Sequence, residues 1–335
     1  MNKLKPTIED VAREAGVSRA TASRVINNAP GASGLLRSRV HAAVAALGYQ
    51  PNESARALAS GRKRAVDLVA LSYEPSIERL GADPYYSRVL AGMVSALEGV
   101  DAQLRVHAGR QADGPDLLDR VADDVTAGAV LINVPPALAA GFHQRCARTV
   151  SLGATAPAVP AVEADNIGGA YAAVRQLYDL GRRRIAAIHG PEANTCAIDR
   201  RIGHAQAVRD LGLADLSARG GFVRSGGHRA AGELLARHPD IDAMFVACDL
   251  MAAGAIQAIT ASGRRVPEDV SVVGFDDSLV AICTNPPLST MHLPVEQMAA
   301  AATRALLGGA VVPGYRERFP VELVTRESTG HPSTV

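Results

Sequence analysis

Apolar residues recur at helical spacing near the start of the chain. Val11, Ala12 and Ala15 stand within one turn of each other, a spacing that places them on one face of a short helix. Thr7 can cap this helix, because an acidic residue follows three positions later as in a capping box. Gly16 then supplies a corner that tolerates a positive φ. The pattern predicts a first helix that ends in a sharp turn.

Two more short helices are predicted after this turn. Ser18 caps the second, which turns Val25 and Ile26 inward, and the third begins after Ser33 and stops at Gly48. Helix, tight turn and helix is the arrangement with which helix-turn-helix proteins read the DNA major groove. An ordinary helical hairpin with solvated charges is the alternative. The outward face of the second helix bears small side chains and hydrogen-bond donors without a carboxylate: Arg19, Ala20, Thr21, Ser23, Arg24 and Asn27.

Charge is distributed unevenly along the chain. Residues 1–64 contain eleven Lys or Arg and four Asp or Glu, a net charge of +7, whereas the whole chain carries +1. The remaining residues therefore carry −6. A basic head on an acidic body favours a polyanionic partner, and so DNA, over a merely solvated hairpin.

A short linker follows the three predicted helices. Pro51 ends the preceding element, Asn52 can cap a new one, and Gly61 stops it after about two turns. A helix this short is unstable alone in water, so we expect it to order only on a partner. Its Leu58 has no local core to enter. A frayed linker with an incidental leucine is the alternative.

Beyond residue 64 the pattern changes to short apolar runs that alternate with helical stretches. Such alternation predicts parallel sheets covered on both faces, and the length suffices for two sheets. Strands are predicted at 65–71, 102–107, 128–132, 149–152, 184–188, 243–247 and 270–273, and helices at 87–99, 117–125, 168–180, 201–211, 230–237 and 252–262.

Two segments of the body are interpreted as irregular. The uncharged run 125–144 contains Asn133, two prolines and His143, which exclude a membrane span. We interpret this run as a buried strand followed by a loop. The proline-bearing segment 154–161 is interpreted as a solvated connector.

Polar and aromatic residues gather at four predicted strand ends, where ligands of such sheets bind. Aromatic platforms beside a charged, bidentate hydrogen-bonding group suit a sugar-like or nucleoside-like ligand. For the two aspartates, helix capping is the alternative. The four groups are Asp83-Pro84-Tyr85-Tyr86, Asp199-Arg200, Phe222 and Asp276-Asp277.

Other kinds of chemistry lack support in the sequence. The four cysteines, at positions 146, 196, 248 and 283, and the nine histidines show no disulfide or metal-ligand spacing, which fits a reducing cytosol. His189 and His292 stand at strand ends and are interpreted as packed or capping residues. There is no Walker loop, nucleophile elbow or dinucleotide fingerprint. We expect no metal, no cofactor, no catalysis and no signal peptide, and therefore a cytoplasmic protein, associated with the nucleoid when bound to DNA.

Three motifs of the head and linker carry a family resemblance. They are Ile8-x-Asp10-Val-Ala-x-x-Ala15-Gly-Val-Ser18, Thr21-x-Ser23-Arg24-Val, and Leu47-Gly-Tyr49-x-Pro51-Asn52-x-x-Ala55-x-x-Leu58. Together they resemble the lactose-repressor (LacI/GalR) family of bacterial transcription regulators. The resemblance implies that Arg19 and Ala20 read bases and that Leu58 wedges into the minor groove. The DNA contacts it implies are Thr7, Ser18, Arg19, Ala20, Thr21, Ser23, Arg24, Asn27, Tyr49, Asn52, Ala55 and Leu58.

The resemblance continues through the body. Arg200-x-x-Gly203 and Gly274-Phe-Asp276-Asp277 match the family's effector-cleft motifs. The chain departs from the family at Cys248, where an asparagine is common, and at Ser151, where some sugar-binding members have an acid. The implied effector site comprises Tyr85, Tyr86, Ser151, Arg200, Phe222, Cys248 and Asp276.

The expected organisation has three parts. An all-α three-helix helix-turn-helix head (1–50) and a hinge helix (51–64) precede an α/β body (65–335) for effector binding and dimerisation. The body is expected to form two doubly wound parallel-sheet lobes, as in periplasmic binding proteins, with crossovers near Glu163, His292 and Val321. Lobe 1 comprises about 65–163 plus 293–320, and lobe 2 about 164–292 plus 321–330. No leucine heptad follows Gly330, so a homodimer is expected.

The predicted function is a ligand-responsive transcription repressor that binds a palindromic double-stranded operator as a dimer. A sugar-like effector in the cleft between the lobes would alter hinge order and DNA affinity. Two alternatives remain at this point: an architectural DNA-binding protein that responds to no ligand, and a sugar-modifying α/β enzyme with a DNA-binding head.

Overall fold

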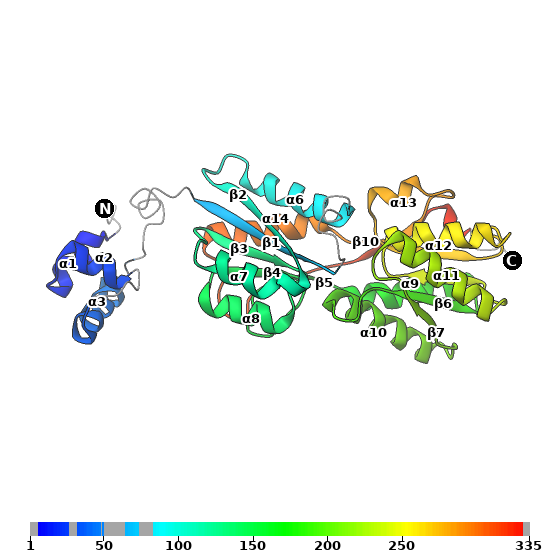
Figure 1. The fold of residues 1–335 in the computed structure, drawn as a ribbon, viewed down its shortest axis with the longest axis horizontal. Coiled ribbons are helices and arrows are strands. Elements are labelled where there is room, and N and C mark those ends of the chain that lie inside the picture. Colours follow the sequence, from blue (N-terminus) through cyan, green and yellow to red (C-terminus); the bar gives the residue numbers. More distant parts are fainter. Residues whose placement is uncertain (1–5, 27–31, 48, 50–63, 74–82, 331–335) are drawn as a thin grey trace. The chain divides into compact units, whose positions relative to one another are not determined.

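The structure, a computed structural model, describes residues 6–26, 32–47, 49, 64–73 and 83–330. It divides into two compact units, residues 1–64 and 65–335, labelled by element in Figure 1. The predicted hinge helix lies outside the described residues, and with it Asn52, Ala55 and Leu58; Asn27 lies outside them as well.

The first unit contains the predicted helix-turn-helix head. Its helices are α1 (Ile8–Ala15), α2 (Arg19–Ile26) and α3 (Gly34–Leu47). Thr7 and Asp10 form a full capping box, and Gly16 adopts a left-handed conformation at φ 62°. The fold of the head is therefore confirmed. Its small core consists of Val11, Ala15, Val25, Val40 and Ala43.

The second unit contains two six-stranded sheets, which confirms the two-lobed α/β body. Lobe 1 has the strand order β11-β5-β4-β3-β1-β2 and lobe 2 the order β12-β10-β9-β8-β6-β7. All neighbours pair in parallel except β12, which runs antiparallel to β10. The strands are β1 (Ala65–Ser72), β2 (Gln103–Arg110), β3 (Gly128–Ile132), β4 (Thr149–Leu152), β5 (Ala161–Ala164), β6 (Ile185–His189), β7 (Leu216–Arg219), β8 (Ala243–Val246), β9 (Ser271–Asp276), β10 (Ser289–His292), β11 (Arg316–Phe319) and β12 (Glu322–Val324).

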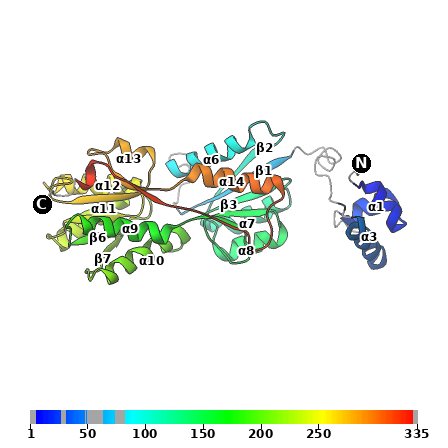
Figure 2. The ribbon, with the colours of Figure 1, turned by 180° about the vertical axis from the view of Figure 1, so that it is seen from behind.

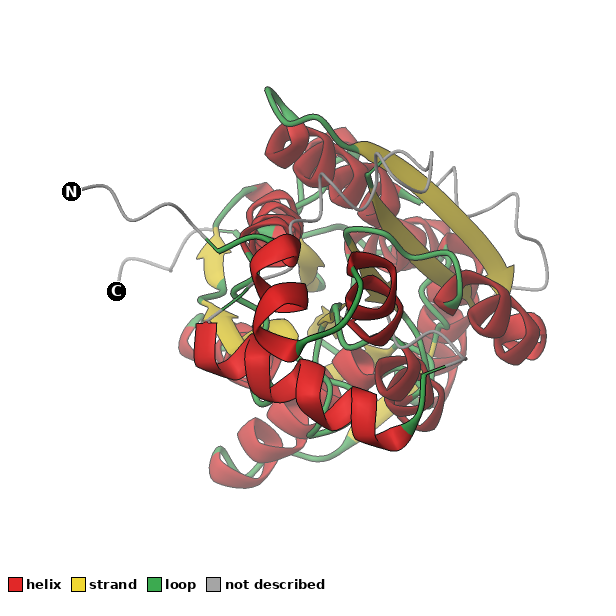
Figure 3. Cartoon of the chain, turned by 90° about the vertical axis from the view of Figure 1, so that its left-hand side faces the viewer, coloured by secondary structure: helices red, strands yellow, loops and turns green. Residues whose placement is uncertain are grey.

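Helices lie on both sides of the strands in each lobe (Figure 1), and from the end shown in Figure 3 the red helices lie around the yellow strands. In lobe 1, Val66 and Leu68 of β1 pack toward α6, whereas Val69 and Leu71 pack toward α7 and α8. Burial on both faces explains why such strands read as unbroken apolar runs. The helices of the body are α6 (Pro84–Leu97), α7 (Gly114–Ala122), α8 (Pro136–Arg145), α9 (Asn166–Asp179), α10 (Thr195–Asp210), α11 (Arg224–Arg237), α12 (Asp249–Ala261), α13 (Leu279–Cys283) and α14 (Val295–Gly308).

The chain changes lobe three times. It leaves lobe 1 between β5 and α9, returns between β10 and α14, and leaves again between β11 and β12. The last crossover belongs to the red C-terminal segment that runs between the lobes in Figure 2. Three chain segments therefore connect the two lobes.

Two local expectations were wrong, and one strand was not predicted. The supposed loop after residue 132 contains α8, because Pro136 stands at the tolerated first helical position and Ala139 and Phe142 are buried one turn apart. Residues 154–160 form the expected connector, but no strand was predicted at β5, which follows it and pairs with β4 and β11. The helix expected from Arg201 begins at Thr195, capped by the Asn194 side chain.

Two histidines lie buried in lobe 2 and are packed residues, as interpreted for His189. The exposed fractions of His189 and His204 are 6% and 1%, and their rings meet edge to face with centroids 5.0 Å apart. Burial, reinforced by His204, lowers the pKa of His189 to about 3. Burial also lowers the pKa of His204. Both rings are therefore neutral in the folded chain at neutral pH.

We predict that His189 makes the protein acid-sensitive. An unfolded histidine binds a proton below pH ~6.5, whereas folded His189 stays neutral until about pH 3. The free energy of unfolding should therefore fall as the pH drops below 6.5, by about 2 kcal/mol at pH 5. Urea unfolding at pH 7.5 and 5.0 measures this difference. His189→Gln should shrink it, whereas His228→Gln on the exposed face of α11 should leave it intact; equal pH differences in both variants would contradict the prediction.

Candidate functional site

The outer face of α2 presents the side chains predicted to meet DNA. Arg19, Ala20 and Arg24 are exposed, while Thr21 and Ser23 are half-buried. The Ser18 hydroxyl accepts a hydrogen bond from the Thr21 backbone N–H at 3.1 Å. This contact fixes the start of α2 and leaves the exposed side chains projecting from a defined helix end.

Among the other predicted DNA contacts, Arg19 forms an exposed ion pair, whereas Thr7 and Tyr49 make contacts that stabilise the head. The Arg19 guanidinium lies 2.8 Å from the Glu9 carboxylate, with exposed fractions of 72% and 51%. A pair this exposed contributes little stability, so Arg19 can exchange Glu9 for another acceptor at little cost. Thr7 is occupied by the capping box of α1. Tyr49 packs against the head core, and its N–H donates to the Val44 carbonyl oxygen at 3.1 Å.

A cleft between the two lobes of the body contains about 830 Å³ of space, part of it open to solvent. Residues from both lobes line it, and most follow the carboxyl end of a strand, as expected for parallel sheets. The lining comprises Asp83, Pro84, Tyr85, Tyr86, Arg88, Asn133, Gly153, Ala164, Leu293 and Met298 with Asn166, Asn194, Cys196, Arg200, Phe222, Cys248, Leu250, Asp276 and Ser278.

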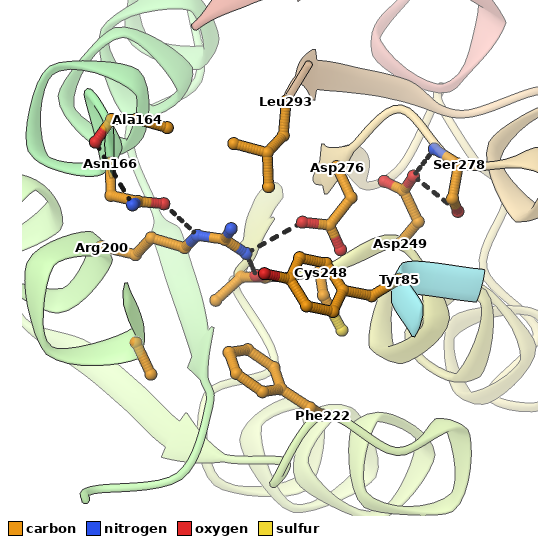
Figure 4. Close-up of polar contacts among 12 residues, drawn as sticks. Tyr85, Ala164, Asn166, Arg200, Phe222, Cys248, Asp249, Asp276, Ser278 and Leu293 are labelled. Atoms are coloured by element: carbon orange, nitrogen blue, oxygen red, sulfur yellow. Dashed lines mark hydrogen bonds and ion pairs between the residues drawn. The ribbon is translucent and has the colours of Figure 1, made fainter. Parts of the chain in front are cut away.

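Arg200 lies at the centre of this cleft (Figure 4). Its Nε donates to the Asn166 side chain at 2.9 Å, and its Nη1 donates to the Ala247 carbonyl oxygen at 2.5 Å. The same nitrogen lies 3.1 Å from an Asp276 carboxylate oxygen. Only 4% of Arg200 is exposed. The guanidinium is thus held by α9 and by the ends of β8 and β9 before any ligand arrives.

Asp276 ends β9 in an unusual environment. Its backbone φ is 112°, a conformation that L residues rarely adopt. Burial raises the pKa of its carboxyl although Arg200 and then Arg88 oppose the shift. Behind it, the fully buried Asp249 accepts hydrogen bonds from Ser278 and Thr290. Burial, and then the charge of Asp276, raise the pKa of Asp249. Asp276 therefore faces Arg200 in the cleft, with a second, fully buried acid behind it.

The capping alternative for the two aspartates was wrong. Ser278, not an aspartate, stands at the N-cap of α13, which has no side-chain capping bond. Asp277 instead binds the His292 ring at 2.9 Å and the Arg326 guanidinium at 2.6 Å. Burial by itself raises the pKa of the Asp277 carboxyl, but the contacts with Arg326 and His292 outweigh burial and leave that pKa below its ordinary value. Asp276 faces the cleft and Asp277 faces the crossover.

Aromatic side chains flank the arginine. Tyr85 and Tyr86 at the start of α6 meet edge to face, with ring centroids 5.6 Å apart. Phe222 adopts a φ of 63°, and its ring covers Gly190 so closely that a Cβ there would lie 2.4 Å from it. The Phe222 ring centroid lies 6.0 Å from the Arg200 guanidinium carbon. The cleft thus offers flat apolar surfaces beside charged hydrogen-bonding groups, which suits a polyhydroxylated ring.

Two asparagines that the sequence reasoning did not assign to the site connect the lobes. Asn133 donates to the Tyr86 hydroxyl at 2.6 Å, and Asn194 donates to the Asn133 side-chain oxygen at 2.9 Å. Asn133 directly follows β3, so its place at a strand end was an available signal. Asn194 caps α10, and that helix start was misplaced. Asp83 is another lining residue; burial raises the pKa of its carboxyl to about 6.

Two residues of the expected effector site are placed differently from the rest. Ser151 is fully buried within β4 and does not line the cleft; Gly153, two residues on, does. Cys248 lines the cleft, but its Sγ also caps α12 by accepting the Met251 N–H at 3.4 Å. Tyr85, Tyr86, Arg200, Phe222 and Asp276 all line the cleft.

The described residues provide neither a metal-binding cluster nor a membrane-spanning helix. Within them, no group of three or more His, Cys, Asp or Glu side chains is arranged to hold a metal ion. None of the described helices has both the length and the apolar character needed to cross a bilayer.

Known proteins match both parts of the chain. The family described as bacterial regulatory proteins, lacI family, matches residues 7–52, and the periplasmic binding protein-like domain matches residues 174–329. The transcriptional regulator CelR of Thermobifida fusca is 36% identical over 97% of this chain and 99% of its own length. GalR of Escherichia coli is 33% identical over 98% and 96%.

Solved structures agree with this assignment. The complex of the transcriptional regulator CelR with cellobiose matches with a TM-score of 0.72 at 35% identity, over 96% of this chain and 99% of that chain. The lac repressor dimer bound to operator and the anti-inducer ONPF matches with a TM-score of 0.71 at 28% identity, over 98% and 100%. These relatives are transcriptional regulators and match almost from end to end. The chain therefore belongs to the lacI family of bacterial regulatory proteins.

Proposed function

We propose that this protein is a transcription repressor that binds a palindromic operator as a homodimer. A sugar-like effector that enters the cleft would lower or raise its affinity for the operator. The observation that carries the proposal is the preorganised Arg200–Asp276 pair in a cleft lined by both lobes. A built ligand site argues against a purely architectural role. The relatives are regulators, which argues against an enzyme.

A sugar is the proposed effector class. Sugar hydroxyls can donate to the Asp276 carboxylate and accept from Arg200, while ring faces stack on Tyr85 or Phe222. A related regulator is known in complex with cellobiose, which supports an oligosaccharide or a similar neutral sugar. Nucleosides share a flat ring and hydroxyls and belong in the same binding screen.

Effector binding would act through the angle between the lobes. A ligand that contacts both lobes favours the arrangement in which those contacts are made. The linker 51–64 joins the head to β1 of lobe 1, so lobe 1 of each protomer sets the spacing of the two linkers. Because a two-turn hinge helix is marginal alone, a coupling of about 1–3 kcal/mol is enough to switch it.

The homodimer is proposed from large apolar side chains that are exposed on both lobes. On α13, Leu279 and Ile282 are 69% and 57% exposed, and Val94 on α6 is 58% exposed. The start of α6 and α13 together line a second, shallow groove. Single exposed apolar residues are ordinary, but several on adjacent elements mark an interface. A two-fold dimer would also match a palindromic operator.

We predict that Asp276→Asn weakens effector binding by about 10- to 100-fold, because a hydrogen bond to a charged group contributes about 1.5–3 kcal/mol. Calorimetry against cellobiose, other sugars and nucleosides first identifies an effector for the wild type; its effect on operator affinity is then measured. Asp277→Asn makes the same chemical change one residue away, at a carboxylate bound to His292 and Arg326, and should weaken binding less than about threefold. Equal losses in both variants would remove Asp276 from the effector site.

We predict that Arg19→Ala relaxes base preference at one base pair of each half-site, because an arginine fork on guanine contributes about 1–3 kcal/mol of discrimination. Sequencing of operators selected from a random library measures this preference. Arg24→Ala, at a residue that is also exposed on α2, should instead weaken binding to all sequences alike. An unaltered base preference in Arg19→Ala would refute base reading by this residue.

We predict that Ile282→Glu converts the dimer to monomers at micromolar concentration, since a buried unpaired carboxylate is costly at an apolar interface. Sedimentation velocity reports the oligomeric state. Val312→Glu is the matched control, because Val312 has the same 57% exposure but lies on the loop after α14. A dimer that survives Ile282→Glu would place the interface elsewhere.

A further inference from the structure

Arg88 of α6 connects elements that belong to different lobes. Its Nε and Nη2 bind both carboxylate oxygens of Glu296 on α14, at 2.7 and 2.8 Å. Its Nη1 donates to the backbone carbonyl oxygen of Asp276 at 2.7 Å, and Nη2 also donates to the Leu293 carbonyl oxygen at 2.8 Å. The side chain is only 13% exposed. One guanidinium therefore joins lobe 1, the crossover before α14 and the end of β9 in lobe 2.

The lobe 1 end of this connection is firm. The α6 and α14 helices touch through their backbones, because a Cβ on Gly92 would lie only 2.2 Å from the Glu296 carbonyl oxygen. The bidentate pair with Glu296 orients the guanidinium on this helix pair. Movement of Arg88 relative to lobe 1 is thereby restricted.

The lobe 2 end is a segment in which the backbone is strained. Asp276 and Asp277 have φ values of 112° and 53°, a region in which L residues persist only when their surroundings hold them. Arg88 holds this segment from lobe 1, and Arg326 and His292 hold the Asp277 carboxylate. The Asp276 carboxylate, in turn, pairs with Arg200 in the cleft. The same residue therefore faces the effector with its side chain and lobe 1 with its carbonyl.

We propose that Arg88 is a positioning residue that couples effector occupancy at Asp276 to lobe 1, and so to the linker and the DNA-binding head. The proposal rests on the proposed function. A ligand that shifts the Asp276 side chain changes the position of the carbonyl that Arg88 holds, and the α6–α14 pair follows. Without Arg88, the effector still meets the cleft, but lobe 1 receives less of the change.

The test compares operator affinity with and without saturating effector in the full-length protein. The ratio of the two dissociation constants measures coupling, and saturation makes it independent of effector affinity. In Arg88→Met this ratio should move toward one by about fivefold or more. Arg88→Lys keeps the charge but not the fork, so its ratio should lie between those of Arg88→Met and the wild type.

Arg105→Met is the matched control. Arg105 also makes a two-point ion pair, with the buried Asp67, but all of its hydrogen bonds to Asp67 and Asp124 stay within lobe 1. Arg105→Met therefore removes from lobe 1 an ion pair similar to that of Arg88 with Glu296, but it removes no hydrogen bond to lobe 2. Hydrogen exchange in effector-free protein supplies a second readout: a peptide covering residues 271–283 should exchange faster in Arg88→Met and not in Arg105→Met.

Loss of coupling in Arg88→Met, with coupling kept in Arg105→Met, supports the proposal. Wild-type coupling in Arg88→Met, or equal losses in both variants, overturns it. If Arg88→Met does not fold, Arg88→Lys is compared with Arg105→Lys in the same way. If no effector alters operator affinity in the wild type, the proposed function fails. Hydrogen exchange then tests by itself whether Arg88 holds residues 271–283: equal exchange rates in Arg88→Met and Arg105→Met overturn the proposed role of Arg88.

Discussion

The buried pair of Arg200 and Asp276 is the interaction on which the cleft depends. Asp276 needs Arg200 to offset its burial, and Arg200 needs Asp276, Asn166 and the Ala247 carbonyl to satisfy its own donors. Removing one member of a buried pair costs about 3–5 kcal/mol, because the remaining charge has no partner. The pair therefore fixes the carboxyl ends of β8 and β9 and the start of α9 around one point, which gives a ligand a rigid set of hydrogen-bonding groups.

Polar contacts join the two lobes across the cleft. Arg88 donates to the Asp276 carbonyl oxygen, and Asn194 donates to Asn133. Hydrogen bonds of this kind contribute about 1 kcal/mol each. The ligand-driven change of lobe angle that we propose would have to break or remake such contacts.

The head follows a different physical principle from the body. Its core is small, its helices are short and capped, and its reading face is polar and exposed. The ion pair of Arg19 with Glu9 is too exposed to hold the arginine firmly. Excess positive charge in residues 1–64 favours attraction to any DNA, and we propose that the side chains of α2 supply selectivity. In the proposed dimer, regulation would change the placement of the two heads rather than the chemistry of either.

The sequence by itself determined the elements whose pattern is strong and local. Apolar runs predicted β1, β3 and β8, and the Thr7–Gly16 pattern predicted α1 with its cap and turn. Prediction from the sequence missed α8, because prolines at a helix start resemble those of a loop. It also missed β5, a short strand next to a proline-rich segment. The sequence did identify Tyr85, Arg200 and Asp276 as candidate ligand-binding residues, and all three line the cleft. Only the tertiary structure decided that Asn133 and Asn194 meet across the cleft, that Ser151 faces away from it and that Arg88 reaches Asp276. The Asn133–Asn194 and Arg88–Asp276 contacts join residues 61 and 188 positions apart. The direction of a side chain at such a contact depends on sheet register and lobe packing, which local spacing does not encode.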